Sequence, residues 1–128
     1  DIHEQINEEN SKFIFKRISG AFTIQQHQAE LIKAHYESCN YAKIICGDLN
    51  NSAFSYVYRT IKGDMKDAFE EAGTSFGKSY NFKYYPARID YIFVENNIKV
   101  KQFKSINTFF QSDHFPQITR LSITPKAK

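Results

Sequence analysis

The sequence predicts a fold of the α/β class, with helices packed on a sheet in one layer pair. Segments rich in helix-forming residues alternate with short apolar runs that end at turn-forming residues. The sequence also holds 12 Phe and 8 Tyr, and aromatic residues favour strands. The chain of 128 residues has the size of a single domain and shows no internal repeat or linker. We therefore expect one domain over residues 1–128.

The first predicted helix spans residues 22–36. This stretch lacks Gly and Pro, is rich in Gln, Ala and Glu, and carries apolar residues at helical spacing, namely Ala29, Ile32 and Tyr36. Thr23 is a candidate N-cap. The preceding residues are polar and acidic over 1–10 and show no periodicity, so residues 1–20 are predicted to form a loop or a frayed end.

The first predicted strand, residues 42–46, is a short apolar run that stops at a glycine. A helical turn is expected over 54–61, and a short helix over 65–72, which Asp64 would cap and Gly73 would end. Four further strands are predicted from runs rich in apolar and aromatic residues, near 80–84, 89–94, 100–109 and 117–124, with a turn at 95–97.

Polar side chains gather at the ends of these strands or interrupt them. Asp48 and Asn50 follow the first strand, and open α/β sheets bind ligands at the carboxyl ends of their strands. Asp90 lies within an apolar strand and would share a face with Arg88. A buried carboxylate is costly unless it is paired. His114 is a suitable partner, because a carboxylate that accepts a ring N–H favours the imidazolium.

Each of these clusters also has a plain structural interpretation. Gly-Asp-x-Asn is most often a turn, Arg-x-Asp in a strand is usually a local ion pair, and Asp-His before proline is usually a solvated loop. These interpretations do not explain why a carboxylate with an amide, a strand-borne carboxylate, and a carboxylate with an imidazole occur together and in this order. The combination favours a functional site.

Three motifs carry a resemblance to a known family. They are GDLN at residues 47–50, RIDYI at residues 88–92 and SDHFP at residues 112–116. In this order and spacing they resemble the endonuclease/exonuclease/phosphatase family. The match runs from about residue 22 to about residue 124 and covers only the second half of the family's domain. The motifs of the first half are missing, including the glutamate that is the family's main metal ligand.

The resemblance implies a fold and an activity. The fold would be half of a four-layered α/β/β/α sandwich, with one mixed, mainly antiparallel sheet and helices on one face. The activity would be divalent-metal-dependent hydrolysis of phosphodiester or phosphomonoester bonds, with Mg²⁺ or Mn²⁺ as the cofactor. This chain alone would be inactive, because the first half of the site is missing.

The resemblance also implies a role for each site residue. His114 would contact the scissile phosphate or the attacking water, and Asp90 would orient its ring. Asp48 would position or deprotonate the water, Asn50 would donate its amide to a phosphate oxygen, and Asp113 would join the metal site. Four neighbouring residues have secondary roles. Asn51 and Arg59 could touch phosphate, and Arg88 and Ser112 would support the site.

Two classes of function remain open from the sequence. The first is the phosphoesterase. The second is a non-catalytic module that binds a phosphorylated ligand or partner, which the missing glutamate keeps open. The substrate could be a nucleic acid, an inositol phosphate or a phospholipid. A net charge of +3 suits a phosphate-bearing substrate but does not choose among these.

The missing first half of the same domain is the expected partner. The half that is present would expose an apolar sheet face, built from residues such as Ile44, Ile92 or Tyr91. We expect this face to be covered by self-association, by a tightly held cleaved first half or by an N-terminal segment folded over it. No run approaches the roughly 18 apolar residues of a membrane span, and no signal peptide is visible. A missing front could carry either, so the compartment stays open.

Overall fold

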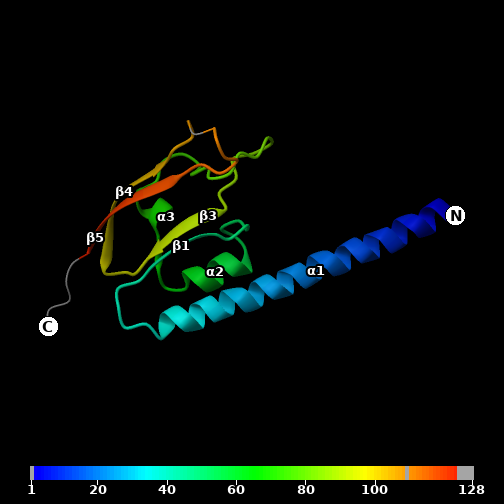
Figure 1. Cartoon of the computed structure of the whole chain (residues 1–128), viewed down its shortest axis with the longest axis horizontal. Coiled ribbons are helices and arrows are strands. Elements are labelled where there is room, and N and C mark those ends of the chain that lie inside the picture. The colour runs from blue at the N-terminus through cyan, green and yellow to red at the C-terminus, as the bar shows by residue number, and fades with distance from the viewer. Residues whose placement is uncertain (1, 109, 124–128) are drawn as a thin grey trace.

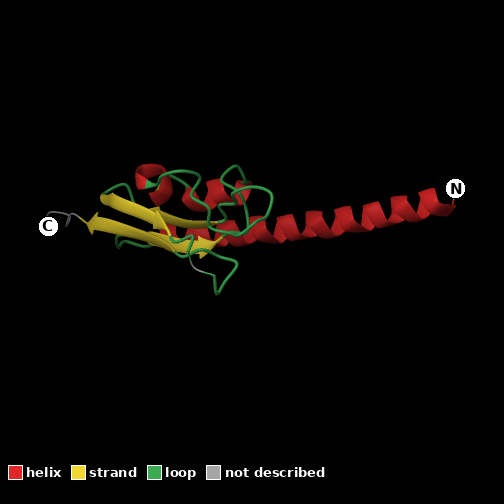
Figure 2. Cartoon of the chain, turned by 90° about the horizontal axis from the view of Figure 1, so that it is seen from above, coloured by secondary structure: helices red, strands yellow, loops and turns green. Residues whose placement is uncertain are grey.

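A computed structural model describes residues 2–108 and 110–123 of the chain (Figure 1). These residues form three helices and five strands, and the strands make two sheets on which helices pack (Figures 1 and 2). The predicted α/β class is confirmed. Their bounds, in chain order, are α1 (Ile2–Glu37), β1 (Ile44–Asp48), α2 (Tyr56–Lys62), β2 (Lys66–Asp67), α3 (Ala68–Ala72), β3 (Asp90–Val94), β4 (Ile98–Ser105) and β5 (Gln117–Ile123).

The strands form two antiparallel sheets where a single sheet was predicted. β1, β3 and β2 are hydrogen-bonded in that order, and β4 pairs with β5 in a separate sheet. Val94 of β3 is opposite Ile44 of β1 and also opposite Lys66 of β2, so both edges of β3 are occupied. No edge of β3 is left for β4, and the chain turns at residues 95–97 into a second sheet.

Helix α1 begins at Ile2, so the prediction of a loop or frayed end over residues 1–20 was wrong. The segment lacks the apolar periodicity that signals packing, but it is free of proline and contains several Glu, Lys and Arg residues, which favour a helix. Thr23 does not cap the helix, because its Oγ1 donates to the carbonyl of Ser19 at 3.0 Å, as a threonine inside a helix can. Figure 1 shows the N-terminal part of α1 extending beyond the sheets.

Several shorter elements also differ from the predictions. No strand forms over residues 80–84, where Tyr80 makes only isolated bridges to Ala87 and His114. The helix expected from residue 65 begins at Ala68, because the two preceding residues pair with β3 and Asp67 caps the helix in place of Asp64. Gly73 ends that helix as predicted. Three predicted positions lie outside the described residues: Asp1, Phe109 and Thr124.

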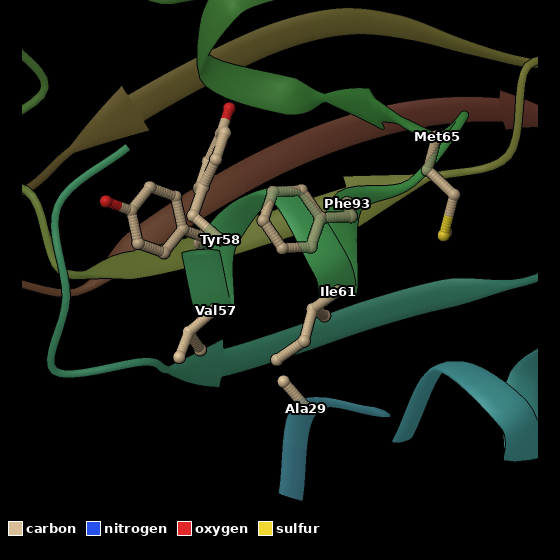
Figure 3. Packing of buried hydrophobic residues seen from close by; sticks show 7 residues of the cluster. Ala29, Val57, Tyr58, Ile61, Met65 and Phe93 are labelled. Atoms are coloured by element: carbon tan, nitrogen blue, oxygen red, sulfur yellow. The ribbon is translucent and has the colours of Figure 1, made fainter. Parts of the chain in front are cut away.

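Strand β3 is the centre of the core, and its side chains alternate between two buried clusters. Tyr91 and Phe93 belong to a cluster that also contains residues of α1, of α2 and of the loop after α2, and Figure 3 shows this cluster with Phe93 labelled. The residues of that cluster are Ala29, Val57, Tyr58, Ile61 and Met65. Ile92 and Val94 face the other way and pack with Ala68, Ile98 and Phe103. Helix α2 therefore lies in the cluster on one face of β3, with α1 packed against α2, whereas α3 contributes to the other face.

The exposed apolar face is smaller than predicted. Ile44 of β1 is 45% exposed, in agreement with the prediction. Tyr91 and Ile92 are buried in the two core clusters and do not belong to an exposed face. None of the described helices combines the length and the apolar composition that a membrane span requires.

A buried ion pair links the core to the segment before β3. Asp67 is 1% exposed, and its carboxylate accepts hydrogen bonds from the guanidinium of Arg88 and from the hydroxyl of Tyr58. Burial, together with the charges of Asp67 and Glu70, raises the pKa of Tyr58, so its hydroxyl stays a donor. The Arg88 guanidinium also lies over the ring of Tyr91, at 4.7 Å. Arg88 therefore does not share a face with Asp90, as its position in the motif had suggested.

We predict that Arg88→Ala destabilises the fold by about 3–5 kcal/mol, because it leaves a buried carboxylate without its charge partner. Arg59→Ala is the matched control. Arg59 is exposed and donates to the backbone carbonyl of Phe54, so its loss should cost less than about 0.5 kcal/mol. Urea denaturation followed by circular dichroism measures both. Equal midpoints for the two variants would contradict the role given to the buried pair.

Candidate functional site

Two carboxylates lie opposite each other at the end of the first sheet. Asp48, the last residue of β1, and Asp90, the first residue of β3, are direct partners in the antiparallel register. Residues opposite each other in such a pair place their side chains on the same face, with Cβ atoms about 4.5–5.5 Å apart. Two negative charges in that position destabilise the pair unless a cation lies between them.

His114 lies between the two carboxylates and supplies that positive charge when its ring is protonated. Its ring Nδ1 lies 2.9 Å from Oδ2 of Asp90, and its ring Nε2 lies 3.9 Å from Oδ2 of Asp48. A carboxylate can only accept, so Nδ1 carries a proton and donates it to Asp90. The prediction that the His114 ring is hydrogen-bonded to Asp90 is confirmed. The ring is thereby held with Nε2 toward Asp48.

The charges around His114 favour its protonated form. The hydrogen bond to Asp90 raises the pKa of His114 above its ordinary value of 6.5, although partial burial opposes this shift. The negative charges of Asp90, Asp48 and Asp113 raise it further. Because the folded pKa is the higher one, this pairing stabilises the fold fully below the unfolded pKa and is lost as the pH rises through the folded pKa.

The loop between β1 and α2 is shaped by the same carboxylate that faces His114. Oδ1 of Asp48 accepts from the backbone N–H of Asn50 at 2.7 Å, and Asn50 has a positive φ of 49°, which asparagine tolerates better than most residues. Asn51 fixes the far side of this turn. Its Nδ2 donates to the carbonyl of Leu49 at 2.8 Å, and its own carbonyl accepts from the hydroxyl of Tyr91 at 2.9 Å.

Ser79, which sequence reasoning missed, ties the two halves of the site together. It is fully buried, and its Oγ accepts from the N–H groups of Ile89 at 2.9 Å and of Asp90 at 3.0 Å. Its carbonyl accepts from the N–H of Phe115 at 2.7 Å. One serine thus sets the backbone of Asp90 and the backbone beside His114. A lone serine before an aromatic run carries no pattern that could have revealed this role.

The segment that carries His114 is held by further short-range bonds. Oγ of Ser112 accepts from the N–H of His114 at 3.0 Å, which agrees with the supporting role predicted for this serine. The carbonyl of Asp113 accepts from the N–H of Asn81 at 2.7 Å. The ring of Tyr80 lies edge-on to the His114 ring, with centroids 5.0 Å apart. Tyr80 is a second neighbour of the site that lies outside the three motifs.

Not all predicted site residues meet in the described structure. Asp48, Asp90 and His114 line one open cavity of about 520 Å³, together with Ser112. Asn50 and Asn51 line a neighbouring cavity. Asp113 is exposed and lines neither cavity, and Arg59 donates to the carbonyl of Phe54 at 3.1 Å and lines neither. The expected contacts of Asp113 with a metal and of Arg59 with phosphate stay predictions.

Asp48, Asp90 and His114 also form a possible, incomplete metal site. Each offers one ligand atom, and these atoms lie within 4.8 Å of one another, with His114 able to use Nε2 as a ligand only while that nitrogen is unprotonated. Mg²⁺ prefers near-octahedral oxygen coordination, and only two of the three side chains offer oxygen, one of them already bonded to the imidazole. Mn²⁺ follows a similar preference for carboxylate and water. The described residues therefore fit part of such a site, and the remaining ligands would come from elsewhere.

Together these features define a class of site. An imidazole oriented by one carboxylate and facing a second, on an α/β fold, can exchange protons with a bound molecule and stabilise negative charge on it. The chain belongs to the endonuclease/exonuclease/phosphatase family, whose sequence model matches residues 17–114.

Comparisons with solved structures agree with this fold. The chain is similar to a mannosyl-6-phosphatase of Bacteroides thetaiotaomicron, with a TM-score of 0.62 and 22% sequence identity over 77% of this chain. It is also similar to an endonuclease/exonuclease/phosphatase family protein of the same organism, with a TM-score of 0.63 and 22% identity over 80% of this chain. The match covers 46% and 45% of those two chains, so this chain spans about half their length. A comparison with curated proteins found no match.

We predict that Asp90→Asn lowers the pKa of His114 toward 6.5, because it removes the charged acceptor of the ring hydrogen bond. An NMR titration of the His114 ring protons measures this shift directly. Asp113→Asn is the control, since Asp113 acts on His114 through its charge and not through a hydrogen bond to the ring. A shift as large in Asp113→Asn as in Asp90→Asn would show that the hydrogen bond is not the main cause.

Proposed function

We propose that this chain supplies the imidazole half of the active site of a divalent-metal-dependent phosphoesterase. The observation that carries the proposal is the position of His114 between Asp90 and Asp48, at 2.9 Å and 3.9 Å. Hydrolysis of a phosphoester needs an activated water, donors for the charge on the phosphoryl oxygens and protonation of the leaving oxygen. The three residues offer groups suited to the first two of these needs.

His114 would donate from Nε2 to a phosphoryl oxygen. With Nδ1 bonded to Asp90, Nε2 is the ring atom that is left for a ligand. The raised pKa of His114 keeps both ring nitrogens protonated to higher pH, so the ring can donate to an anion and stabilise its charge. Asp90 acts through His114, since it fixes the orientation of the ring and balances its charge.

Asp48 would hold the attacking water. One of its oxygens, Oδ1, accepts from the N–H of Asn50, and Oδ2 lies on the side of His114. A carboxylate beside an imidazolium can accept a proton from water while the imidazolium donates to the phosphate. Asn50 lies in the same turn, and its amide would donate to a phosphate oxygen.

Mg²⁺ or Mn²⁺ would bind at the edge of this site, with Asp113 as a ligand from this chain. Such an ion neutralises charge on the phosphoryl oxygens when it is bound. Asp113 is exposed and lies two positions before Phe115, whose backbone is anchored on Ser79, so its carboxylate is accessible on a fixed segment. The other ligands would come from a first half of the domain, because this chain spans about half the length of the solved structures with the same fold.

The substrate would be a phosphodiester or a phosphomonoester. One of the two structural neighbours is a mannosyl-6-phosphatase, so sugar phosphates join nucleic acids, inositol phosphates and phospholipids as candidates. A panel with one member of each class, tested on the full-length protein, identifies the substrate. If no ester is hydrolysed and a phosphorylated ligand still binds, the protein is a non-catalytic binding module instead.

We predict that His114→Ala and Asp48→Asn each reduce hydrolysis by the full-length protein by roughly 10²- to 10⁴-fold, the usual contribution of a positioned acid or base. Lys101→Ala is the control, because Lys101 is an exposed residue of β4 and carries a screened charge. Steady-state kinetics with saturating Mg²⁺ or Mn²⁺ measures all three. Wild-type turnover in His114→Ala would remove the histidine from the mechanism.

We further propose that this chain alone is inactive and associates through the exposed side of β1. Ile44 and Cys46 lie on that side and are both exposed, while Ile45 between them faces the other way and packs on the core. Light scattering of the 128-residue chain should show a dimer or larger species at micromolar concentration, and Ile44→Lys should shift it toward the monomer. A monomeric wild type at these concentrations would contradict self-association.

A further inference from the structure

A second cavity, of about 620 Å³, lies beside the His114 site and has a different chemistry. Aromatic side chains form much of its wall, and several of them are exposed. The exposed aromatic residues that line it are Phe54 (88% exposed), Phe76 (73%), Tyr85 (61%) and Phe82 (37%). Single exposed apolar residues are ordinary, but a group of large aromatic side chains around one hollow marks a binding surface. We call this hollow the aromatic cavity.

Two residues connect the aromatic cavity to the proposed catalytic site. Asn50 lines the cavity, and its N–H is bonded to Asp48, which lines the site. Tyr80 lines the cavity, and its ring contacts the ring of His114, with centroids 5.0 Å apart. The lining of the aromatic cavity thus contacts residues of the His114 site at two points, Asn50 and Tyr80. A molecule with its phosphate at His114 can extend into the aromatic cavity.

The charges of the aromatic cavity limit what can occupy it. Among the described residues that line it, Arg88 is the sole charged one, and its guanidinium is already paired with the buried carboxylate of Asp67. The polar groups are otherwise neutral, with the side chains of Asn50, Asn51 and Ser75 among them. A second phosphate placed there would lose its hydration without gaining an unpaired cation. An uncharged ring would instead stack on the aromatic side chains and bond to the neutral polar groups.

Part of the aromatic wall is held in place by contacts between rings. The ring of Phe82 contacts the rings of Tyr85 and Tyr84, with centroids at 4.7 Å and 5.6 Å. Within the described residues, two non-glycine residues have a positive φ, Asn50 at 49° and Ser75 at 63°, and both line this cavity. Such conformations cost free energy, and they tend to occur where function needs them.

We propose that the aromatic cavity binds the alcohol part of the phosphoester, and that this part carries an uncharged ring without further phosphates. The proposal rests on the function proposed above, because it places the scissile phosphate at His114. It predicts monoesters or diesters of a neutral sugar or of an aromatic ring as substrates. It excludes esters whose ring carries several phosphates, such as polyphosphorylated inositols.

Four phosphomonoesters test the proposal on the full-length protein. Glucose 6-phosphate carries a neutral sugar ring, 4-nitrophenyl phosphate carries an aromatic ring, glycerol 3-phosphate carries no ring, and glucose 1,6-bisphosphate carries a second phosphate. We expect glucose 6-phosphate, 4-nitrophenyl phosphate or both to have the highest kcat/KM. The ratio of the two kcat/KM values shows whether the cavity prefers a sugar ring or an aromatic ring. The highest kcat/KM for glycerol 3-phosphate or for the bisphosphate would overturn the proposal.

Variants of the wall locate the binding to the cavity. Phe54→Ala is the main variant, because so exposed a side chain contributes little to folding, and Phe82→Ala is the second. Each should lower kcat/KM for the preferred ring-bearing ester about 3- to 10-fold, the usual size of an aromatic contact. Each variant should change kcat/KM for glycerol 3-phosphate less than twofold. Tyr41→Ala, an exposed aromatic outside both cavities, is the matched control and should change neither. Equal losses with both esters would contradict the proposal.

A binding measurement separates failure of this proposal from failure of the proposed function. Saturation-transfer NMR with phenyl phosphate and with glucose 6-phosphate detects contact between the ring protons and the protein, with or without turnover. Transfer that falls in Phe54→Ala but persists in His114→Ala supports the cavity even if no ester is hydrolysed. Hydrolysis without any such effect of Phe54→Ala overturns the cavity and leaves the proposed function in place. Neither transfer nor hydrolysis overturns both.

Discussion

The site depends on a conflict of charge between two neighbouring strands. Asp48 and Asp90 are cross-strand partners, and the antiparallel register gives their carboxylates the same face of the sheet. The pair is tolerable because His114 lies between them with a raised pKa. The rest of the site follows from this arrangement: β1 and β3 must end in register, and the segment before β5 must return to the same edge of the sheet.

The segment before β5 is held at this edge mainly by hydrogen bonds to backbone groups, and less by the side chains that would perform the chemistry. Ser79 accepts from the N–H of Asp90 with its hydroxyl and from the N–H of Phe115 with its carbonyl. On the other face of β3, the buried ion pair with Asp67 holds Arg88 in place, just before the strand begins. The two anchors hold the chain on either side of β3. The site is therefore rigid where His114 meets Asp90 and open where a ligand enters.

Sequence reasoning predicted the meeting of His114 with Asp90, because a carboxylate in an apolar strand needs a partner and an imidazole stood before the last strand. It could not predict Ser79, since a hydroxyl that accepts two backbone N–H groups depends on the fold and leaves no pattern. The start of α1 was missed because apolar periodicity reports packing and not helix formation. The division into two sheets was missed because β2, Lys66–Asp67, is too short to show a strand pattern, yet it occupies the second edge of β3.

Strand β1 is at the end of the sheet order β1, β3, β2, so in the described part of the chain its outer edge has no strand beside it. Unpaired N–H and C=O groups along an edge are a template for another strand. A strand that paired there would run past Cys46 and Asp48 and would place its own side chains beside theirs, at the edge of the site. If that strand carried the remaining ligands of the proposed metal site, extension of the sheet would complete the site in the same step.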